Sequence, residues 1–487
     1  MKYKIALYGF GSLPVIGRHL IDLAHKETAP IEWCAILTLP HYRALLHEVL
    51  PTSEILDLFK SLPREPGSSD LSCLSAYPGS LVEDLAAQKR TRRRRTGQWR
   101  LNRAVDIYIA YKEFLIARGA THILMPIIET PDAKIAVAVA KELGLGVIAP
   151  VDLRNLTGTY FSTDCYETPP SYAVAGFEAR AMAREFIAQF RTKPAPARHL
   201  PADVNPNFDD QTVLRDYLPP FWSRLRGFVK YAIERPDLFE PDMVRVSVMS
   251  NVALLRNGVR SIRQRRNEMQ FDIGCVDGLP KRFVFYPLQY SPEASINTPA
   301  PYFVDQFRVV DALRYAMPSD CMLVVKEHPV CLEMRPVGFM RAIRKLPGVI
   351  TVKGDIPAIE VIKRATVTAT VTGTAAFEAF LLGRPAVALG PGLPAWVLGG
   401  HATLGTLRDA ISKAIVRCPS DDFVIDQAAK LLSVRYPFFF GTAHMPGEPM
   451  LRVGNLRRFL SALLDHLERE RSVSAPSMAH MPQAAAT

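Results

Sequence analysis

The stretch that decides the fold is VTATVTGTAAFEAFLLGRPAVAL, residues 367–389. Its β-branched start predicts a strand over Val367–Val371, and the run rich in Ala, Phe and Leu predicts a helix over Ala375–Leu382. A Gly-Arg-Pro sequence ends that helix, and Ala386–Leu389 has the composition of the next strand. The stretch therefore predicts a strand–turn–helix–strand unit of a parallel sheet.

The turn of this unit, Thr372 to Thr374, has the composition of a phosphate-binding site. A glycine-containing turn that opens a helix at the carboxyl end of a parallel strand points free backbone N–H groups and the helix dipole at an anion. The two threonine hydroxyls add donors, and Glu378 follows one turn inside the helix. The alternative is an ordinary βαβ unit in which Glu378 only favours the N-terminal half of its helix.

Length and composition indicate more than one domain. The chain has 487 residues, 48% of them hydrophobic, which favours two domains and an insertion over one core. The net charge of +11 is uneven, because six of the seven residues in Lys89–Arg95 are basic. Such a run is either a solvated loop or a contact with anionic lipid.

Cysteine usage and hydropathy favour a cytoplasmic protein. The seven cysteines are scattered without a CxxC pair, which is typical of reduced thiols and not of a disulfide or zinc framework. No apolar run approaches the roughly 18 residues of a membrane-spanning helix. The expected localisation is cytoplasmic.

The N-terminal segment resembles a dinucleotide-binding unit but lacks its fingerprint. A strand over Tyr3–Tyr8 leads into a turn with Gly9, Gly11 and Ser12. Gly17 follows Gly11 by six residues, whereas the fingerprint needs three, so an NAD site is not predicted.

Strands alternate with amphipathic helices in two separate parts of the chain, which predicts an α/β protein with two parallel sheets. We expect a first Rossmann-like domain over residues 1–171 and a second over 276–471. Residues 172–275 are predicted to form a basic helical insertion. The small and polar segment 472–487 is predicted to be a disordered tail.

Three polar loops follow strands of the second domain: Pro287–Ser295, Lys326–Pro329 and Thr372–Thr374. Ligands of such sheets bind at the carboxyl ends of the strands, so these loops are expected to share one site. Its candidate nucleotide- and phosphate-binding residues are Gln289, Ser291, Glu293, Lys326, His328, Thr372, Gly373, Thr374 and Glu378.

The strings YPLQYSPEAS, VKEHP and TGTAAFEAFLLGRP resemble bacterial capsule and surface-polysaccharide biosynthesis glycosyltransferases. The resemblance extends over roughly residues 282–399, and more loosely over 108–167. It implies a GT-B-like fold, in which two Rossmann-like domains face a cleft.

The resemblance also implies roles for individual residues. In relatives of the Kdo- and sialyltransferase type, a His-Pro motif and a Ser/Thr turn contact the donor phosphate, and a glutamate contacts the sugar of the nucleotide. These roles fall on His328, on Thr372 and Thr374, and on Glu378. Some relatives have paired serines where this chain has Thr-Gly-Thr, so the nucleotide stays open between CMP and UDP.

The resulting hypothesis is transfer of a sugar from a nucleotide-sugar to a capsule polysaccharide, surface polysaccharide or glycolipid acceptor. A carboxylate or a histidine of the first domain would deprotonate the acceptor hydroxyl, with Glu129, Asp132 and Asp164 as candidates. The turn with Gly9, Gly11 and Ser12 would lie on the acceptor side of the cleft. Asp132 is alternatively the cap of its helix. No Asp-x-Asp sequence occurs, so we expect neither a metal nor a cofactor, the nucleotide-sugar being a substrate.

Two alternative functions also fit the sequence. A nucleotide-sugar 2-epimerase would share the fold but needs several acidic and His groups around C2 of the sugar. A non-catalytic partner in polysaccharide assembly or export would use the basic helices for docking. The basic segments suit peripheral contact with an anionic inner membrane and a lipid-linked acceptor, and no nucleic-acid partner is expected.

Overall fold

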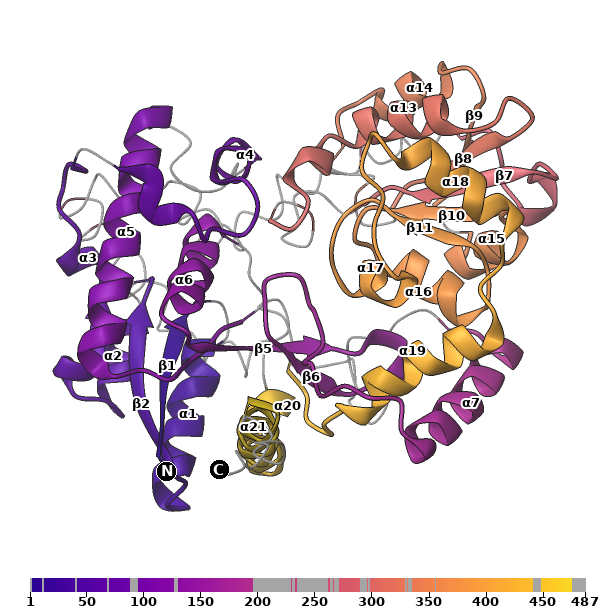
Figure 1. The fold of residues 1–487 in the computed structure, drawn as a ribbon. Helices are drawn as coiled ribbons and strands as arrows, with labels where there is room; N and C mark the ends of the chain where they lie inside the picture. The colour runs from indigo at the N-terminus through magenta and orange to yellow at the C-terminus, as the bar shows by residue number, and fades with distance from the viewer. Residues whose placement is uncertain are drawn as a thin grey trace, which may run out of the picture.

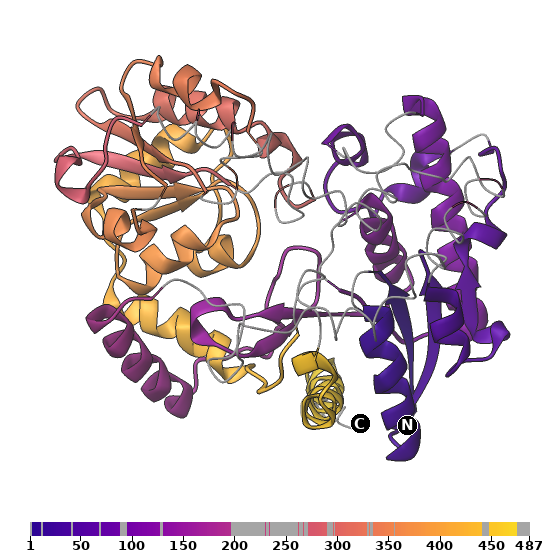
Figure 2. The same ribbon diagram turned by 180° about the vertical axis from the view of Figure 1, so that it is seen from behind.

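The computed structural model describes residues 2–474 except 11–12, 40–41, 68–69, 88–94, 127–129, most of 196–270, 290–295, 297, 329–330, 332–334, 355 and 441–447. Figure 1 shows two lobes, an indigo-to-purple one from the N-terminal part and a salmon-to-orange one from the C-terminal part. The same two lobes are seen from behind in Figure 2.

The N-terminal lobe is built on a six-stranded sheet of order β3-β2-β1-β4-β5-β6. The first five strands are parallel, and β6 runs antiparallel to β5. The strands are β1 (Tyr3–Gly9), β2 (Ile31–Leu37), β3 (Ile55–Asp57), β4 (His122–Leu124), β5 (Gly146–Asp152) and β6 (Thr159–Ser162).

Helices cover both faces of this sheet. One core lies under α5 (Gly97–Arg118) and α6 (Pro131–Glu142), and the other lies under α1 (Leu13–Lys26). Thr96 caps α5 by accepting a hydrogen bond from the backbone N of Trp99 at 3.2 Å. The shorter helices of this lobe are α2 (Arg43–His47), α3 (Leu58–Ser61) and α4 (Leu81–Ala87).

The C-terminal lobe contains a five-stranded parallel sheet of order β11-β10-β7-β8-β9. Its strands are β7 (Phe283–Pro287), β8 (Met322–Lys326), β9 (Val349–Val352), β10 (Val367–Thr370) and β11 (Ala386–Ala388). One face packs against α13 (Gln306–Ala316), α14 (Phe339–Arg344) and α18 (Leu407–Val416), and the other against α15 (Ala358–Arg364) and α16 (Thr374–Leu381). The two Rossmann-like halves predicted from the sequence are thereby confirmed.

A separate core joins the lobes. Side chains of the β5–β6 hairpin, among them Val151, Leu153 and Tyr160, pack with α16, α7 (Phe177–Thr192), α17 (Leu393–Leu398) and α19 (Asp421–Ser433). Contact is also made where α4 meets the short 3-10 helix Pro301–Val304. The helix α7, which the sequence places in the basic insertion, packs along α19; most of the remainder of that insertion lies outside the described residues.

The last helix, α21 (Val453–Ser474), returns to the N-terminal lobe, preceded by α20 (Glu448–Leu451). Its apolar side chains, such as Phe459 and Leu463, share a core with Leu13 and Phe161. Figures 1 and 2 show the yellow helix at the junction of the lobes, beside the indigo strands and α1. The expected domain boundary at 471 needs correction here, because α21 covers the N-terminal sheet and extends to Ser474, beyond the expected start of the tail.

Within the described residues, no helix is both long enough and apolar enough to cross a membrane.

Candidate functional site

The ends of β7, β8 and β10 lie side by side at the carboxyl edge of the C-terminal sheet. The three strands are parallel neighbours, with Pro287 opposite Lys326 and Val367 opposite Val284. Each leads directly into one of the three loops predicted to form a site. The structure thus brings the described parts of these loops together, whereas Ser291 and Glu293 lie outside the described residues.

The turn after β10 is held by one buried hydroxyl. The Oγ1 of Thr370 accepts a hydrogen bond from the backbone N of Gly373 at 3.1 Å, and α16 begins at the next residue. Because Gly373 occupies the N-cap position and has no side chain, it leaves the first backbone N–H groups of α16 without a side-chain cap from that position. The local geometry therefore fits an anion at this helix start.

Gly373 packs closely against the ends of two side chains. A Cβ atom built there would lie 2.8 Å from both the Oε1 and the Nε2 of Gln289, and 2.8 Å from the Oγ1 of Thr370. Such a distance is far inside van der Waals contact. The Thr-Gly-Thr sequence therefore has a structural reason at its centre.

The two threonines and the glutamate of this unit differ in accessibility. Thr372 is buried, and Thr374, the first residue of α16, is partly exposed. Glu378 is only 5% exposed, within a helix that is buried on all sides. Glutamate is seldom this deeply buried in proteins.

The loop after β8 holds two of the predicted phosphate contacts in different ways. The Nζ of Lys326 donates to the carbonyl of Gly354 at 2.7 Å, and the lysine is buried. The next-but-one residue, His328, is exposed. Desolvation lowers the pKa of its imidazole, and the cations Lys326 and Arg335 lower it further. A neutral imidazole at neutral pH can still donate one N–H to a phosphate.

An ion pair that sequence reasoning missed lies behind this loop. Glu327 is fully buried, and Arg335, 7% exposed, donates from Nε to its Oε2 at 2.9 Å. Burial raises the pKa of Glu327, and the adjacent guanidinium opposes that rise. The only sequence signal was an acidic residue placed directly after an apolar strand, where it needs a buried counter-charge.

The side chain of Gln289 is buried between the loops after β7 and β10 and does not extend into solvent. Its backbone N donates to the Oε1 of Gln306 at 2.9 Å, and its Nε2 donates to the Oγ1 of Thr370 at 2.8 Å. With 6% exposure, it holds the loops together. Its predicted contact with a ligand is therefore reinterpreted as support of the turn.

The candidate bases of the N-terminal domain have distinct surroundings. Asp132 lies half-buried in the first turn of α6, but Thr130 is the cap, since its Oγ1 accepts from the backbone N of Ala133 at 3.2 Å. The alternative role of Asp132 as helix cap is therefore wrong. Glu129 lies outside the described residues.

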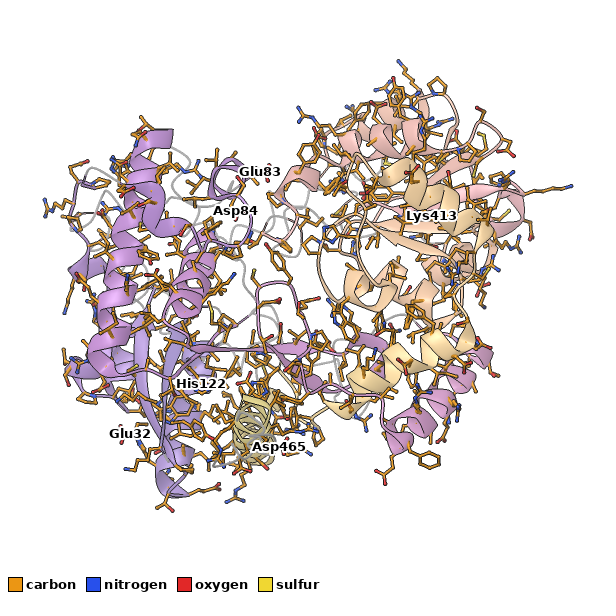
Figure 3. All side chains as sticks on the ribbon, viewed as in Figure 1. Glu32, Glu83, Asp84, His122, Lys413 and Asp465 are labelled. Atoms are coloured by element: carbon orange, nitrogen blue, oxygen red, sulfur yellow. The ribbon has the colours of Figure 1, made fainter. Side chains whose placement is uncertain are left out.

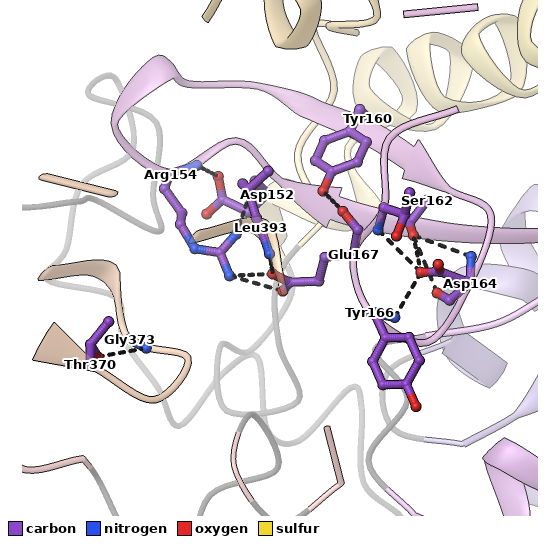
Figure 4. Close-up of polar contacts among 11 residues, drawn as sticks. Asp152, Arg154, Tyr160, Ser162, Asp164, Tyr166, Glu167, Thr370, Gly373 and Leu393 are labelled. Carbon is purple, nitrogen blue, oxygen red and sulfur yellow. Dashed lines mark hydrogen bonds and ion pairs between the residues drawn. The ribbon is translucent and has the colours of Figure 1, made fainter. Parts of the chain in front are cut away.

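The carboxylate of Asp164 is engaged in a turn. Its Oδ1 accepts from the backbone N of Tyr166 at 2.7 Å and of Thr168 at 3.1 Å (Figure 4). This commits one oxygen to the loop after β6. The geometry gives Asp164 a structural role and makes it a weaker candidate for proton transfer than Asp132.

The glycine-lined turn after β1 is only partly described. Gly9 ends the strand, and a Cβ there would lie 2.7 Å from the carbonyl oxygen of Ile36, so close approach to β2 requires the glycine. Gly11 and Ser12 lie outside the described residues.

A second buried ionic cluster lies in the N-terminal domain, between α4 and α6. The Nζ of Lys134 donates to the Oδ2 of Asp84 at 2.8 Å, and the hydroxyl of Tyr77 donates to the same oxygen. Figure 3 labels Asp84 in the N-terminal lobe. Burial raises the pKa of Asp84, and Lys134 opposes this effect. No sequence motif marked these residues, because their partners come from separate elements.

A contact between the two domains lies near the turn Thr372–Thr374. Arg154 donates to both carboxylate oxygens of Glu167 at 2.9 and 2.8 Å, and the same carboxylate accepts from the backbone N of Leu393 at 3.0 Å (Figure 4). Leu393 is the first residue of α17, and the segment between β11 and α17 contains Gly390, which packs on Thr372: a Cβ at Gly390 would lie 3.2 Å from Thr372 Cγ2. The N-terminal domain therefore supports a loop next to the candidate site.

Comparison with known families gives a match to one part of the chain. Residues 251–410 match the family described as capsule polysaccharide biosynthesis protein. This is about a third of the chain, and it includes all three loops of the site. The resemblance predicted from the motifs is confirmed over these residues, and it supports the predicted role in capsule polysaccharide synthesis. No curated protein matches the chain significantly.

Solved structures give only distant likenesses. The β-Kdo 2,4 transferase of Thermosulfurimonas dismutans KpsC is 14% identical, covers 64% of this chain and 88% of its own, and has a TM-score of 0.31. A UDP-GlcNAc 2-epimerase of Methanocaldococcus jannaschii, in complex with UDP-GlcNAc and UDP, is 13% identical. The match covers 89% of this chain and 99% of the epimerase chain, and its TM-score is 0.23. TM-scores this low do not bear on function. The α/β class with two parallel sheets rests on the strand pairings of the structure itself.

Proposed function

We propose that this protein is a glycosyltransferase that moves a sugar from a nucleotide-sugar donor to a capsule polysaccharide, surface polysaccharide or glycolipid acceptor. The observation that carries the proposal is the placement of His328 and the start of α16 at the same carboxyl edge of the sheet, on the two strands that flank β7, inside the region that matches the capsule family. No metal and no cofactor are part of the proposed reaction.

The donor would bind the C-terminal domain through its phosphates. The first backbone N–H groups of α16, the hydroxyls of Thr372 and Thr374, and the imidazole of His328 are the donors of this site. Groups of this kind stabilise the negative charge that develops on a departing nucleotide. Glu378 would accept hydrogen bonds from the sugar hydroxyls of the nucleotide.

The acceptor would bind the N-terminal domain. Its hydroxyl oxygen would bond to the anomeric carbon of the donor sugar as the bond between that carbon and the phosphate oxygen breaks. The hydroxyl proton would pass to a carboxylate, and the bonding electrons would leave with the nucleotide. Asp132 is the described candidate for this base, and Glu129, three residues earlier in the sequence, is the other.

The environment of the acidic groups favours transfer over 2-epimerisation. An epimerase needs several titrating groups around one carbon of the sugar. Of the described acids near this edge, Glu327 is fully buried against Arg335, and Glu378 is assigned to the sugar hydroxyls of the nucleotide. The described part of the site therefore offers donors for phosphate more readily than acids for proton exchange at C2.

The decisive experiment is incubation of the full-length protein with CMP- and UDP-sugars, with and without a lipid-linked or oligosaccharide acceptor. Mass spectrometry would follow the products. Transfer predicts release of nucleotide and extension of the acceptor only when both substrates are present. A changed donor sugar without acceptor would instead show an epimerase, and no turnover in any mixture would indicate a non-catalytic partner.

Two matched variants test the base. Asp132→Asn is expected to abolish transfer while nucleotide binding stays unchanged, because the residue lies in the acceptor domain. Asp164→Asn keeps an oxygen that can accept from the same turn amides, so it is expected to retain most activity. Full activity of Asp132→Asn would remove that residue from the mechanism.

A further inference from the structure

A chain of hydrogen bonds runs behind the candidate site, and its first half starts at His328. The backbone N of His328 donates to the Oε1 of Glu327 at 2.8 Å. Glu327 in turn accepts from Arg335, whose Nη2 also donates to the backbone carbonyl of Gln289 at 2.7 Å. The guanidinium therefore joins the loop after β8 to the loop after β7.

The second half of the chain continues to α16. The Nε2 of Gln289 donates to the Oγ1 of Thr370, and that oxygen accepts from the backbone N of Gly373. Gln289 also packs closely against Gly373, so a side chain at that position would displace the end of Gln289. One unbroken path thus links the backbone of His328 to the residue before α16.

Burial makes this path rigid. Glu327 and Thr370 have no exposed surface, and Gln289 and Arg335 are nearly as buried. Each buried polar group is costly to leave without a partner, so a shift in one loop must be matched in the others. A buried ion pair is weak support for stability, because apolar residues of similar size often serve as well. Its distinctive effect in this location is to fix the geometry of three loops.

We propose that Arg335 and Gln289 are positioning residues that set the spacing between His328 and the start of α16, and so shape the site for a nucleotide phosphate. This inference rests on the proposed function of that edge. Neither residue needs to contact the phosphate. Loss of either should weaken binding of the donor and leave binding of the acceptor unchanged.

The test breaks the path without leaving a buried charge unpaired. The double variant Arg335→Met with Glu327→Met removes both charges, and Gln289→Leu breaks the path at its centre without any change of charge. The matched control is Arg282→Met, because the ion pair of Arg282 with Asp320 precedes the same two strands at the opposite edge of the sheet.

Calorimetric titration with CMP and UDP gives the first readout. The double variant and Gln289→Leu are each expected to bind the nucleotide that the parent prefers about tenfold more weakly, which is the loss of one well-formed charged contact. The control is expected to bind as the parent does. In a transfer assay the donor KM should rise while the acceptor KM stays constant.

Combination of the variants tests whether the path acts as a unit. Adding Gln289→Leu to the double variant should cause little further loss, because a path already broken cannot be broken again. If the loss of nucleotide affinity in the triple variant equals the product of the two separate losses, the residues do not act as a single path. If the path variants bind nucleotide like the parent while His328→Ala does not, positioning is overturned and the proposed function stands. If the parent binds neither CMP nor UDP, both proposals fail.

Discussion

At the residue scale, His328 has the surroundings expected of a phosphate contact. It is exposed at the end of β8, and its pKa is lowered by desolvation and by two neighbouring cations. The imidazole is therefore neutral at neutral pH in the free protein. A bound phosphate would oppose that shift, because an anion favours the protonated ring. Nucleotide binding should then be coupled to uptake of a proton by His328. The affinity for the nucleotide should rise as the pH falls from neutral to below 6.5, the ordinary pKa of histidine.

Replacement of His328 by alanine tests this residue directly. A hydrogen bond to a charged group contributes roughly 1.5–3 kcal/mol, so nucleotide affinity should fall about tenfold or more. The variant should melt like the parent, because an exposed side chain contributes little packing. Titration calorimetry at several pH values is the measurement, and the rise in affinity at lower pH should disappear. Unchanged affinity and unchanged pH dependence would remove His328 from the site.

The sequence predicted some residues of the site and missed others for a physical reason. His328, Thr372 and Thr374 follow strands directly, so local pattern and resemblance together located them. The role of Arg335 depends on the carbonyl of Gln289, which only the pairing of β7 with β8 brings near. A contact between distant segments leaves no trace in local composition.

At the scale of elements, β10, its turn and α16 were predicted to within one residue at the start of the helix. Strand and helix propensities agree with the fold there. The destination of α21 was not predicted. An amphipathic helix shows that one face is buried, but its sequence does not show which domain covers that face.

The packing of α21 makes stability depend on pH through His466. This histidine has no exposed surface and packs on Phe161, while its Nδ1 meets the hydroxyl of Tyr172. Burial lowers its pKa from 6.5 to about 4; among the surrounding charged groups, Glu470 and Asp465 oppose the shift, and His122 and Arg469 add to it.

The sign of the effect follows from the lowered pKa. The unfolded chain takes up the proton as the pH falls below 6.5, and the folded protein does so only near pH 4. Stability should therefore be highest above the unfolded pKa and should fall between these values, by at most roughly 3 kcal/mol. Urea unfolding at pH 7.5, 5.5 and 4.5 measures it. His466→Gln should flatten the dependence, and an equal slope in parent and variant would assign the effect to other groups.

At the scale of the whole molecule, two parallel sheets are joined by the β5–β6 hairpin, by α7 with α19, and by the return of α21. Alternation of strands and helices predicted both sheets. The connection between them was not predictable, because it consists of contacts between segments far apart in sequence, such as Glu167 with Leu393.

A further prediction concerns the basic run Lys89–Arg95, of which residues 89–94 lie outside the described part of the chain. Each cation near an anionic surface contributes about 1 kcal/mol, and salt screens the attraction. Replacement of the five cations in 89–94 by glutamine should weaken sedimentation with anionic vesicles and spare transfer to a soluble acceptor. Arg95 is kept because it lies over the ring of Trp99. Neutral vesicles are the control, and equal sedimentation of parent and variant with anionic vesicles would assign the run to a solvated loop.

The central claim is that the carboxyl edge of the C-terminal sheet binds the donor nucleotide. Its most direct test is thermal unfolding of the parent, Glu378→Gln and Thr374→Val in the presence of CMP, UDP, GDP and ADP, since a ligand that binds only the folded state raises the melting temperature. We expect CMP or UDP to stabilise the parent. Both variants should melt close to the parent without nucleotide and gain much less with it, because each loses one acceptor or donor at nearly constant volume. Equal stabilisation of all three proteins by the same nucleotide would contradict the claim and place the donor site elsewhere.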